Sequence, residues 1–250
     1  MGKKEDRHRK LIQVIKAQGM LPARTLAEVL SVSEMTIRRD FEELRSLHHL
    51  EPVAERQPEM KAYDLLAALQ KSNEQKQKIG KMAASLIKPN DVIIIDTGST
   101  SARMLPYLPE NDNLTVLCFN TNVLLELRYK EGIQPLFCGG FYHRNTEMFE
   151  CPESIQFISR MRANKVFLSA AGVHKELGVT CANEYEVPTK HAVMQSSMER
   201  ILLADSSKFD LVKPSYFCDL SEIHAVITDK GLPGEWAGYL REKGITLYLV

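Results

Sequence analysis

Seven short apolar runs occupy the sequence between residues 92 and 250, and helix-length segments separate most of them. This alternation limits the possible folds more than any other feature of the chain. Buried runs that alternate with helices are typical of parallel strands in an α/β sheet, because crossover helices cover both faces of such a sheet. We therefore predict an α/β fold for this region. The predicted strands are residues 92–96, 114–118, 135–138, 165–169, 200–205, 224–228 and 246–250.

Residues 7–46 have a different pattern, with apolar residues at helical spacing in three short segments. The first segment ends at Gly19, a residue common at helix C-termini, and Pro22 begins the second. A tight turn follows, after which Ser33 is a suitable N-cap for the third helix. Alternatively, Ser31 is the cap, and a glutamate three residues later completes a capping box.

The third predicted helix has an apolar face formed by Ile37, Phe41 and Leu44, so its arginines point elsewhere. A solvent-exposed face with glutamates at i+4 would explain these arginines. The preceding helix and tight turn favour a helix-turn-helix instead, whose third helix enters the major groove of DNA with its N-terminal turns. Arginine, serine and threonine side chains suit contacts with phosphates and base edges. The candidate DNA-binding residues are Ser33, Met35, Thr36, Arg38 and Arg39.

The apolar pattern weakens between residues 47 and 73, where we expect a connector with room for one short hairpin. A helical pattern resumes over residues 75–87. The expected domains are a helix-turn-helix DNA-binding domain at residues 1–60, a linker at residues 61–74, and an α/β domain at residues 75–250.

Composition limits the partners and the compartment. Formal net charge is zero, so overall charge gives no argument for nucleic acid or for a membrane surface. The five cysteines are scattered without C-x-x-C spacing, and no Cys/His group has the spacing of a zinc site, which favours a reducing compartment without a structural metal. No apolar run approaches the ~18 residues that span a bilayer. We expect a cytoplasmic protein with no membrane partner.

Polar or glycine-bearing loops follow four of the predicted strands, at residues 96–101, 119–122, 139–140 and 170–173. Ligands of parallel sheets collect outside the carboxyl ends of the strands. The first loop, “DTGSTS”, offers hydroxyl groups and backbone amides to an anion where a helix begins. An ordinary turn would explain this loop equally well by itself, but similar loops on the same edge favour a phosphate site.

The stretch “SVSEMTIRRDFEEL” closely resembles the winged helix-turn-helix signature of the DeoR family of bacterial repressors. The resemblance continues through “DTGSTS”, “FCGG”, “GVTCANEYEVPTKHAVM” and “LLADSSKF”, and it covers residues 5–250. It implies a ribose-5-phosphate-isomerase-like fold for the second domain and a phosphorylated sugar as effector. Residues 47–60 contain no glycine, so whether they form the family's wing hairpin stays open.

The resemblance also implies the biological role: a repressor that a sugar phosphate releases from operator DNA, without a cofactor. The motifs “LFCGGFYH” and “SAAGVH” look like those of the subgroup concerned with deoxyribonucleoside catabolism, which implies deoxyribose 5-phosphate as the effector. We expect a homo-oligomer, because two linked DNA-binding domains (the heads of the oligomer) gain avidity and read symmetric half-sites of an operator. The expected effector-binding residues are Asp96, Thr97, Gly98, Ser99, Thr100, Asn120, Asn122, Gly139, Gly140, Gly172, Glu186, Lys190 and Lys208.

A sugar-phosphate isomerase is the alternative. Isomerisation needs a carboxylate base that moves a proton between adjacent carbons. The stretch “SAAGVHK” at residues 169–175 has no carboxylate after the fourth strand, where such enzymes carry an acidic run. His143, His174 and His191 do not have the spacing of a catalytic triad or a metal site. We therefore expect a sensor and not an enzyme.

Overall fold

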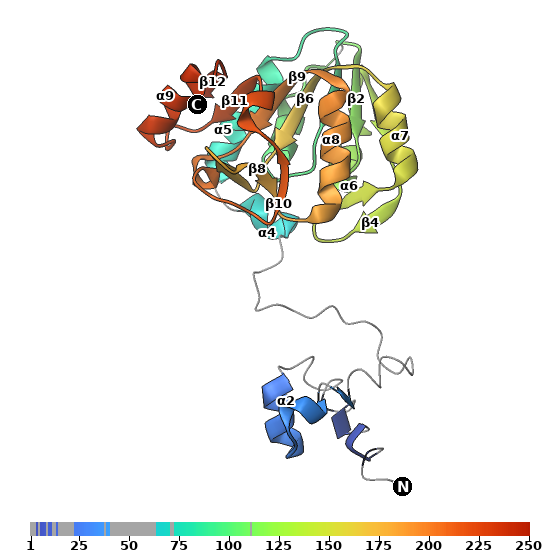
Figure 1. Cartoon of the computed structure of the whole chain (residues 1–250). Helices are drawn as coiled ribbons and strands as arrows, with labels where there is room; N and C mark the ends of the chain where they lie inside the picture. Colours follow the sequence, from blue (N-terminus) through green and yellow to red (C-terminus); the bar gives the residue numbers. More distant parts are fainter. Residues whose placement is uncertain are drawn as a thin grey trace. The chain divides into compact units, whose positions relative to one another are not determined.

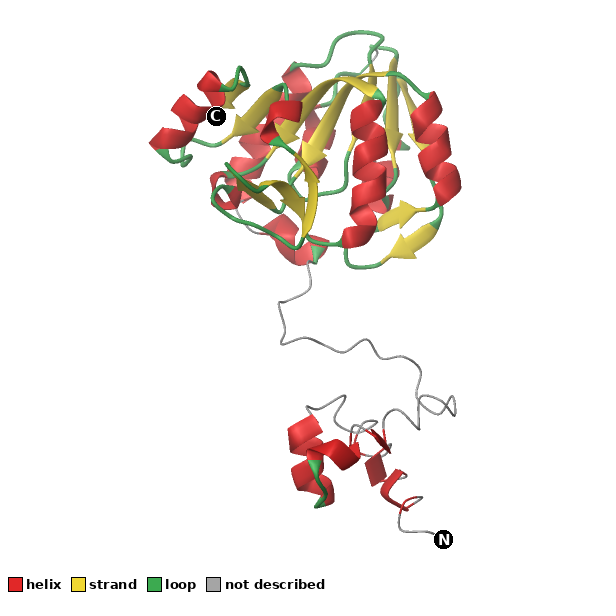
Figure 2. Cartoon of the chain, in the orientation of Figure 1, coloured by secondary structure: helices red, strands yellow, loops and turns green. Residues whose placement is uncertain are grey.

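The chain forms two compact units, residues 1–61 and residues 62–250, in the computed structural model (Figures 1 and 2). Among the described residues, no helix combines the length and the apolar character that crossing a membrane requires. The structure describes residues 4, 6–8, 10, 11, 14, 23–37, 39, 40, 64–70, 73–110 and 112–250.

The first unit contains the predicted tight turn between two helices. Helix α2 spans Ala23–Leu30, and the next helix begins at Glu34. Ser33 is its N-cap, because the Ser33 Oγ accepts a hydrogen bond from the backbone amide of Thr36 at 3.2 Å. The alternative cap, Ser31, has a φ of 53° and lies in the turn. Among the described residues of this unit, Leu11, Leu26, Ala27 and Ile37 form a buried apolar cluster.

Several expectations for the first unit lie outside the described residues. These are Arg38, the apolar residues Phe41 and Leu44, and the connector and wing at residues 47–60.

The second unit is built on a seven-stranded sheet with the order β12-β11-β9-β6-β1-β2-β3. Every neighbouring pair is parallel, and all seven predicted strands are present, with boundaries that differ by a few residues. The predicted α/β fold is therefore confirmed. The strands are β1 Val92–Ile95, β2 Leu114–Cys118, β3 Ile133–Phe137, β6 Ala163–Ser169, β9 Ser197–Leu203, β11 Ala225–Thr228 and β12 Thr246–Leu249.

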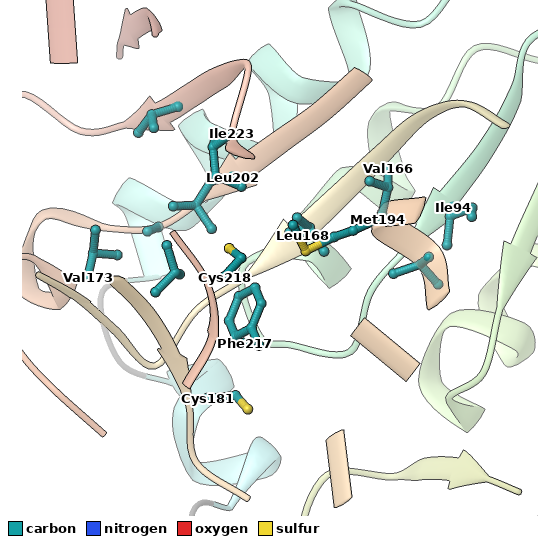
Figure 3. Packing of buried hydrophobic residues seen from close by; sticks show 14 of the residues in the cluster. Ile94, Val166, Leu168, Val173, Cys181, Met194, Leu202, Phe217, Cys218 and Ile223 are labelled. Carbon is teal, nitrogen blue, oxygen red and sulfur yellow. The ribbon is translucent and has the colours of Figure 1, made fainter. Parts of the chain in front are cut away.

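Helices cover both faces of this sheet, because successive strand residues point to opposite faces. Ile94 packs in one buried cluster, which receives residues of α7, α8 and α9. Ile93 and Ile95 pack in a second cluster with residues of α5, η1 and α6. Figure 1 shows α7 and α8 in front of the sheet, and Figure 3 shows Met194 of α8 beside Leu168 of β6. The covering elements are α5 Asn73–Ser85, η1 Ser101–Tyr107, α6 Thr121–Leu127, α7 Pro152–Arg160, α8 Val187–Gln195 and α9 Gly234–Glu242.

Two small antiparallel sheets lie outside the main sheet, and the sequence pattern did not predict them. One is the hairpin of β4 and β5, and the other has the order β10-β8-β7. Their strands have three or four residues each, too few to establish a period of two. These strands are β4 Phe141–His143, β5 Met148–Glu150, β7 Gly172–His174, β8 Gly178–Cys181 and β10 Ser215–Cys218.

The expected linker at residues 61–74 is wrong in part. Helix α4, Leu65–Gln70, and the start of α5 at Asn73 both fall inside it. The six residues of α4 are too few to show helical periodicity, and contacts from distant residues hold the helix.

The helix expected after the first loop is the 3-10 helix η1, which contains Pro106. Proline has no backbone N–H to donate inside a helix, which disfavours a regular α-helix there.

Candidate functional site

The carboxyl ends of β1 and β6 lie at the point where the strand order of the main sheet reverses. The chain runs from β1 to β2 and β3 on one side, then returns to β6 on the other side of β1. Ligands of open parallel sheets bind at such a switch point. Asp96 follows β1 and Ser169 ends β6, and the Ser169 amide donates to Asp96 Oδ2 at 2.9 Å.

A buried ion pair lies at this switch point. Lys190 Nζ, from α8, donates to Asp96 Oδ2 at 2.5 Å, and both side chains are 1% exposed. Lys190 Nζ also donates to the backbone oxygen of Ser169 at 3.2 Å. Burial disfavours the ammonium charge, but the carboxylates of Asp96 and Glu186 outweigh it and raise the pKa of Lys190 above its ordinary value. The lysine is therefore a cation at neutral pH.

Glu186 adds a second carboxyl group, one helical turn before Lys190. Its Oε2 lies 3.9 Å from Lys190 Nζ. Its Oε1 accepts hydrogen bonds from the side chain of Asn183 at 2.8 Å and from the Asn183 backbone amide at 3.2 Å. Burial raises the pKa of Glu186, and the nearby Lys190 partly opposes this rise. The structure thus brings together three predicted residues from distant motifs, Asp96, Glu186 and Lys190.

The predicted phosphate loop, residues 97–101, is buried beside this cluster. The exposed fractions of its threonine and serine side chains are 7% or less. Ser101 Oγ donates to the backbone oxygen of Asp96 at 2.7 Å, which fixes the loop. In the part of the chain that the structure describes, the backbone amides of Gly98, Ser99 and Thr100 donate to no backbone oxygen. Such amides are suited to hold an anion.

Gly98 is required by the close packing of this loop. A Cβ atom at Gly98 would lie 2.6 Å from the Cβ of Ser169, far inside van der Waals contact. Replacing Gly98 with valine would therefore displace Ser169 from Asp96 and damage the fold. Such a variant does not isolate a ligand contact.

Three buried side-chain oxygens in this region have no hydrogen-bond partner among the described residues: Asp96 Oδ1, Asn120 Oδ1 and Asn122 Oδ1. Asn120 is fully buried, and its Nδ2 donates to Thr97 Oγ1 at 3.3 Å. Buried acceptors without a donor are uncommon in native proteins, and they indicate where a ligand or a water donates. Because these oxygens accept, a hydroxyl-bearing ligand or a water can donate to them.

Other expected effector residues lie at the same edge of the main sheet. The structure describes no contact between them and the Asp96–Lys190 ion pair. Gly139 and Gly140 follow β3, and a Cβ atom at Gly140 would clash with the backbone oxygen of Glu150. Gly172 begins β7, where a Cβ atom would lie 2.6 Å from the Leu211 backbone oxygen. Lys208 ends the short helix η3, Ser206–Lys208. Close packing explains Gly140 and Gly172 without a ligand, and their predicted effector role stays an expectation.

Sequence reasoning missed two residues of the cluster. Ser169 contacts Asp96 through its backbone and its hydroxyl group, and its position at the end of a buried strand could have indicated this. Lys76 is 1% exposed, and its Nζ donates to Ser99 Oγ at 3.0 Å. The helical pattern of α5 gives no indication that this lysine is buried.

A wide cavity of about 750 Å³ lies elsewhere, beside α5 and the ends of β11 and β12. Exposed lysines, among them Lys78 and Lys81, line it, and none of the expected effector residues does. The buried ion pair and the three unpaired oxygens described above lie at the switch point and do not line this cavity. Chemistry therefore identifies the switch point as the candidate ligand site.

The second functional surface lies at the start of the helix after Ser33. Met35 is 77% exposed, Arg39 is exposed and Thr36 is half-buried, whereas Ile37 faces the core. Ser33 Oγ lies 2.8 Å from Thr36 Oγ1, so the cap also orients the threonine. The Met35 and Arg39 side chains are therefore exposed on this helix.

A buried ion cluster fixes this helix to the first helical segment. The Asp40 side chain is 2% exposed and accepts from Arg7 Nε at 2.5 Å and Arg7 Nη2 at 2.9 Å. It also lies 2.9 Å from His8 Nε2. The hydrogen bond from Arg7 lowers the pKa of Asp40, so the carboxylate is charged well below neutral pH. Sequence analysis did not identify this cluster, because its residues lie more than 30 positions apart.

We expect Asp40→Asn to destabilise the first unit by about 1.5–3 kcal/mol, because charged hydrogen bonds to Arg7 are lost. The lowered pKa means that Asp40 contributes stability above the unfolded-state pKa, near ~4, and that this contribution disappears as the pH falls further. Thermal melts followed by hydrogen exchange of the first unit would measure both effects. Equal stability of variant and wild type at pH 7 would contradict the role of this cluster.

An amino-terminal helix-turn-helix, joined to a parallel-sheet domain with a polar site at its switch point, defines a DNA-binding regulator that senses a small molecule. The chain matches the family model of the DeoR-like helix-turn-helix domain over residues 7–51 and that of the DeoR C terminal sensor domain over residues 71–230. The chain therefore belongs to the DeoR family. The predicted family, two-part architecture and regulator class are confirmed.

Relatives match over nearly the whole chain. The Deoxyribose operon repressor of Escherichia coli (strain K12) is 31% identical, with 98% of each chain covered. The L-fucose operon activator of Haemophilus influenzae is 29% identical, covering 96% of this chain and 97% of the relative. Ribose 5-phosphate isomerase A from Methanocaldococcus jannaschii is similar in structure, with 18% identity and a TM-score of 0.39 over 55% of this chain and 54% of that chain. A likeness at this TM-score carries no argument about function.

Arg39→Ala is expected to weaken binding to operator DNA that the protein has selected from a random pool. A base-reading arginine contributes about 1–3 kcal/mol and its loss relaxes specificity, whereas loss of a phosphate contact weakens all sequences alike and reduces the salt dependence. Fluorescence anisotropy at several salt concentrations would distinguish the two. Arg38→Ala is the companion variant, and unchanged affinity in both variants would rule out the recognition-helix assignment.

Proposed function

We propose that the protein represses an operon for carbohydrate or deoxyribonucleoside catabolism and leaves its operator when a phosphorylated sugar binds at the switch point. Deoxyribose 5-phosphate is the effector we favour, because the Deoxyribose operon repressor is similar over 98% of both chains. The relatives also include a protein named as an activator, so the sign of regulation needs a direct test.

The unpaired buried acceptors carry this proposal. The free oxygens of Asp96, Asn120 and Asn122 would accept hydrogen bonds from sugar hydroxyl groups. A neutral apolar ligand would leave these oxygens without partners, which costs about 1–3 kcal/mol for each. A polyhydroxylated ligand therefore suits this site better than an apolar one.

The phosphate group would bind at the backbone amides of the 97–101 loop. These amides follow β1 at the switch point, and the Lys76 ammonium lies at the same loop through Ser99. Lys190, whose charge Asp96 and Glu186 already balance, would orient the carboxylates more than it would bind the phosphate. A ligand with a phosphate at one end and hydroxyl groups along its length would satisfy both parts of the site.

Release of DNA requires that the effector prefers the state that binds the operator weakly, because equal affinity for both states would shift nothing. We propose a homo-oligomer that acts in the cytoplasm, in which paired heads read two half-sites. Exposed aromatic residues of β4, Phe141 at 71% and Tyr142 at 46%, support self-association. Light scattering on a size-exclusion column would give the oligomeric state.

An isomerase-type enzyme is the second candidate, because Glu186 and Lys190 form an acid–base pair. We expect deoxyribose 5-phosphate or ribose 5-phosphate to stabilise the protein in a thermal-shift assay without any turnover. Isomerisation that vanishes in Glu186→Gln would instead establish the enzyme. A matched Glu184→Gln variant, two residues away on η2, Glu184–Glu186, is the control for contaminating activity.

A further inference from the structure

Helix α4, the first helix of the second unit, is held at both ends by groups near the candidate effector site. At its N-terminus, the Leu65 amide donates to the backbone oxygen of Asn145 at 2.9 Å. At its C-terminus, Lys76 Nζ donates to the Ala68 oxygen at 2.6 Å. Arg103 Nη2 donates to the neighbouring Leu69 oxygen at 2.8 Å. Two cations therefore cap carbonyl groups that a helix cannot satisfy by itself.

The order of α4 depends on these contacts. An isolated helix of six residues is unstable in water, because nucleation is costly and few hydrogen bonds follow. The Leu65 side chain is 1% exposed and anchors one end. Loss of a cap at the other end would therefore unfold the helix more readily than it would unfold a long one.

Each of the two capping residues is connected to the 97–101 loop. The same Lys76 Nζ that caps Ala68 donates to Ser99 Oγ in the loop. Arg103 lies in η1, which begins at Ser101, the last residue of the loop, and its Nε has no partner among the described atoms. Lys76 thus connects the C-terminus of α4 to the loop through its side chain, and Arg103 does so through its backbone amide, which donates to the Thr100 oxygen at 3.1 Å.

The contact at the N-terminus of α4 is connected by hydrogen bonds to the other side of the candidate effector site. The side-chain oxygen of Asn145 accepts from the Tyr185 hydroxyl at 2.9 Å, and its Nδ2 donates to Asn183 Oδ1 at 3.4 Å. Asn183 in turn donates to Glu186. The neighbouring Thr146 also contacts Tyr185, at 3.1 Å.

We propose that α4 transmits effector binding to the DNA-binding domain, with Lys76 as the positioning residue that links the loop to the helix. This inference rests on the proposed function. A phosphate at the loop amides attracts the Lys76 ammonium and weakens its hydrogen bond to Ala68, so that α4 loses its cap. The first unit ends at residue 61 and α4 begins at Leu65, so unfolding of α4 adds its six residues to the connection between the two units. A longer connection lowers the effective concentration of the second head at a paired operator.

Lys76→Met tests this inference, with Lys78→Met as the matched control. Both lysines lie on α5, but Lys78 is 56% exposed and pairs only with Glu74 in the described contacts. Lys76→Met removes the cap and keeps an unbranched side chain only one atom shorter. We expect its operator affinity without effector to fall by about 5- to 150-fold, toward that of wild type with effector, and deoxyribose 5-phosphate to change it by less than about twofold. Lys78→Met is expected to behave as wild type.

Hydrogen exchange of wild type provides a second measurement that needs no variant. Deoxyribose 5-phosphate should speed exchange of the peptide containing α4 and protect the 97–101 loop. Unchanged exchange in α4 on saturation with effector would overturn the inference, as would a normal operator response in Lys76→Met. If Lys76→Met does not fold, Arg103→Met, which removes the other cap, takes its place with the same expected result. Calorimetry that detects no sugar phosphate binding to wild type would overturn the proposed function itself, and with it the role of α4.

Discussion

Lys190→Met is expected to destabilise the second unit by about 3–5 kcal/mol, because it leaves two buried carboxyl groups without their cation. For a domain of this size, the melting temperature should fall by about 6–20 °C. The raised pKa of Lys190 means that its contribution is complete below the unfolded-state pKa, near ~10.4, and disappears only as the pH rises further. Thermal melts by circular dichroism at pH 7 and pH 9 should therefore show the same deficit.

The double variant Asp96→Asn/Lys190→Met is the control for an unpaired charge. Removing both partners of the ion pair should recover much of the lost stability, because no bare carboxylate remains at Asp96. The exposed pair of Lys78 and Glu74 gives the opposite control, since breaking it should cost less than about 1 kcal/mol. A melting temperature of Lys190→Met within about 2 °C of wild type would contradict the assignment of a buried pair.

Removing the phosphate from the effector is expected to cost far more affinity than altering one sugar hydroxyl group. Charge-assisted hydrogen bonds contribute about 1.5–3 kcal/mol each, so two or more from the loop amides correspond to at least a ~100-fold preference for deoxyribose 5-phosphate over deoxyribose. Calorimetry with both compounds measures this ratio. Ribose 5-phosphate, which adds one hydroxyl group, should differ much less.

Inorganic phosphate is the matched control for this preference. It should bind more weakly than deoxyribose 5-phosphate, because it lacks the sugar hydroxyl groups that would donate to Asp96 and Asn120. Equal affinity for the sugar with and without its phosphate would exclude the phosphate site in the 97–101 loop.

The main sheet could be predicted from the sequence because each of its strands is a run of apolar residues buried on both faces. Ile93, Ile94 and Ile95 illustrate this, since they face alternate clusters and all three are fully buried. The short antiparallel strands and α4 could not be predicted in this way. Contacts with residues far along the chain stabilise these elements, as the hydrogen bond from the Leu65 amide to the Asn145 oxygen does for α4. The local sequence pattern does not reveal such contacts.

The sequence allowed us to predict several residues of the candidate site, but not how they contact one another. The resemblance indicated Asp96, Glu186 and Lys190, but neither spacing nor composition shows that Lys190 donates to Asp96, 94 residues away. Ser169 and Lys76 escaped notice because serine at a strand end and lysine in a charged helix are common surface residues. Burial gives these two residues their importance, and burial depends on the assembled fold.

The most direct test of the proposed function is whether a phosphorylated sugar releases the protein from operator DNA. Fluorescence anisotropy would measure the affinity of the full chain for its selected operator DNA, first without a ligand and then with deoxyribose 5-phosphate or with free deoxyribose. We expect the sugar phosphate to weaken operator binding by about 5- to 150-fold and free deoxyribose at the same concentration to have almost no effect. Equal release by both compounds, or operator binding that no sugar phosphate weakens, would contradict a repressor that senses a phosphorylated sugar.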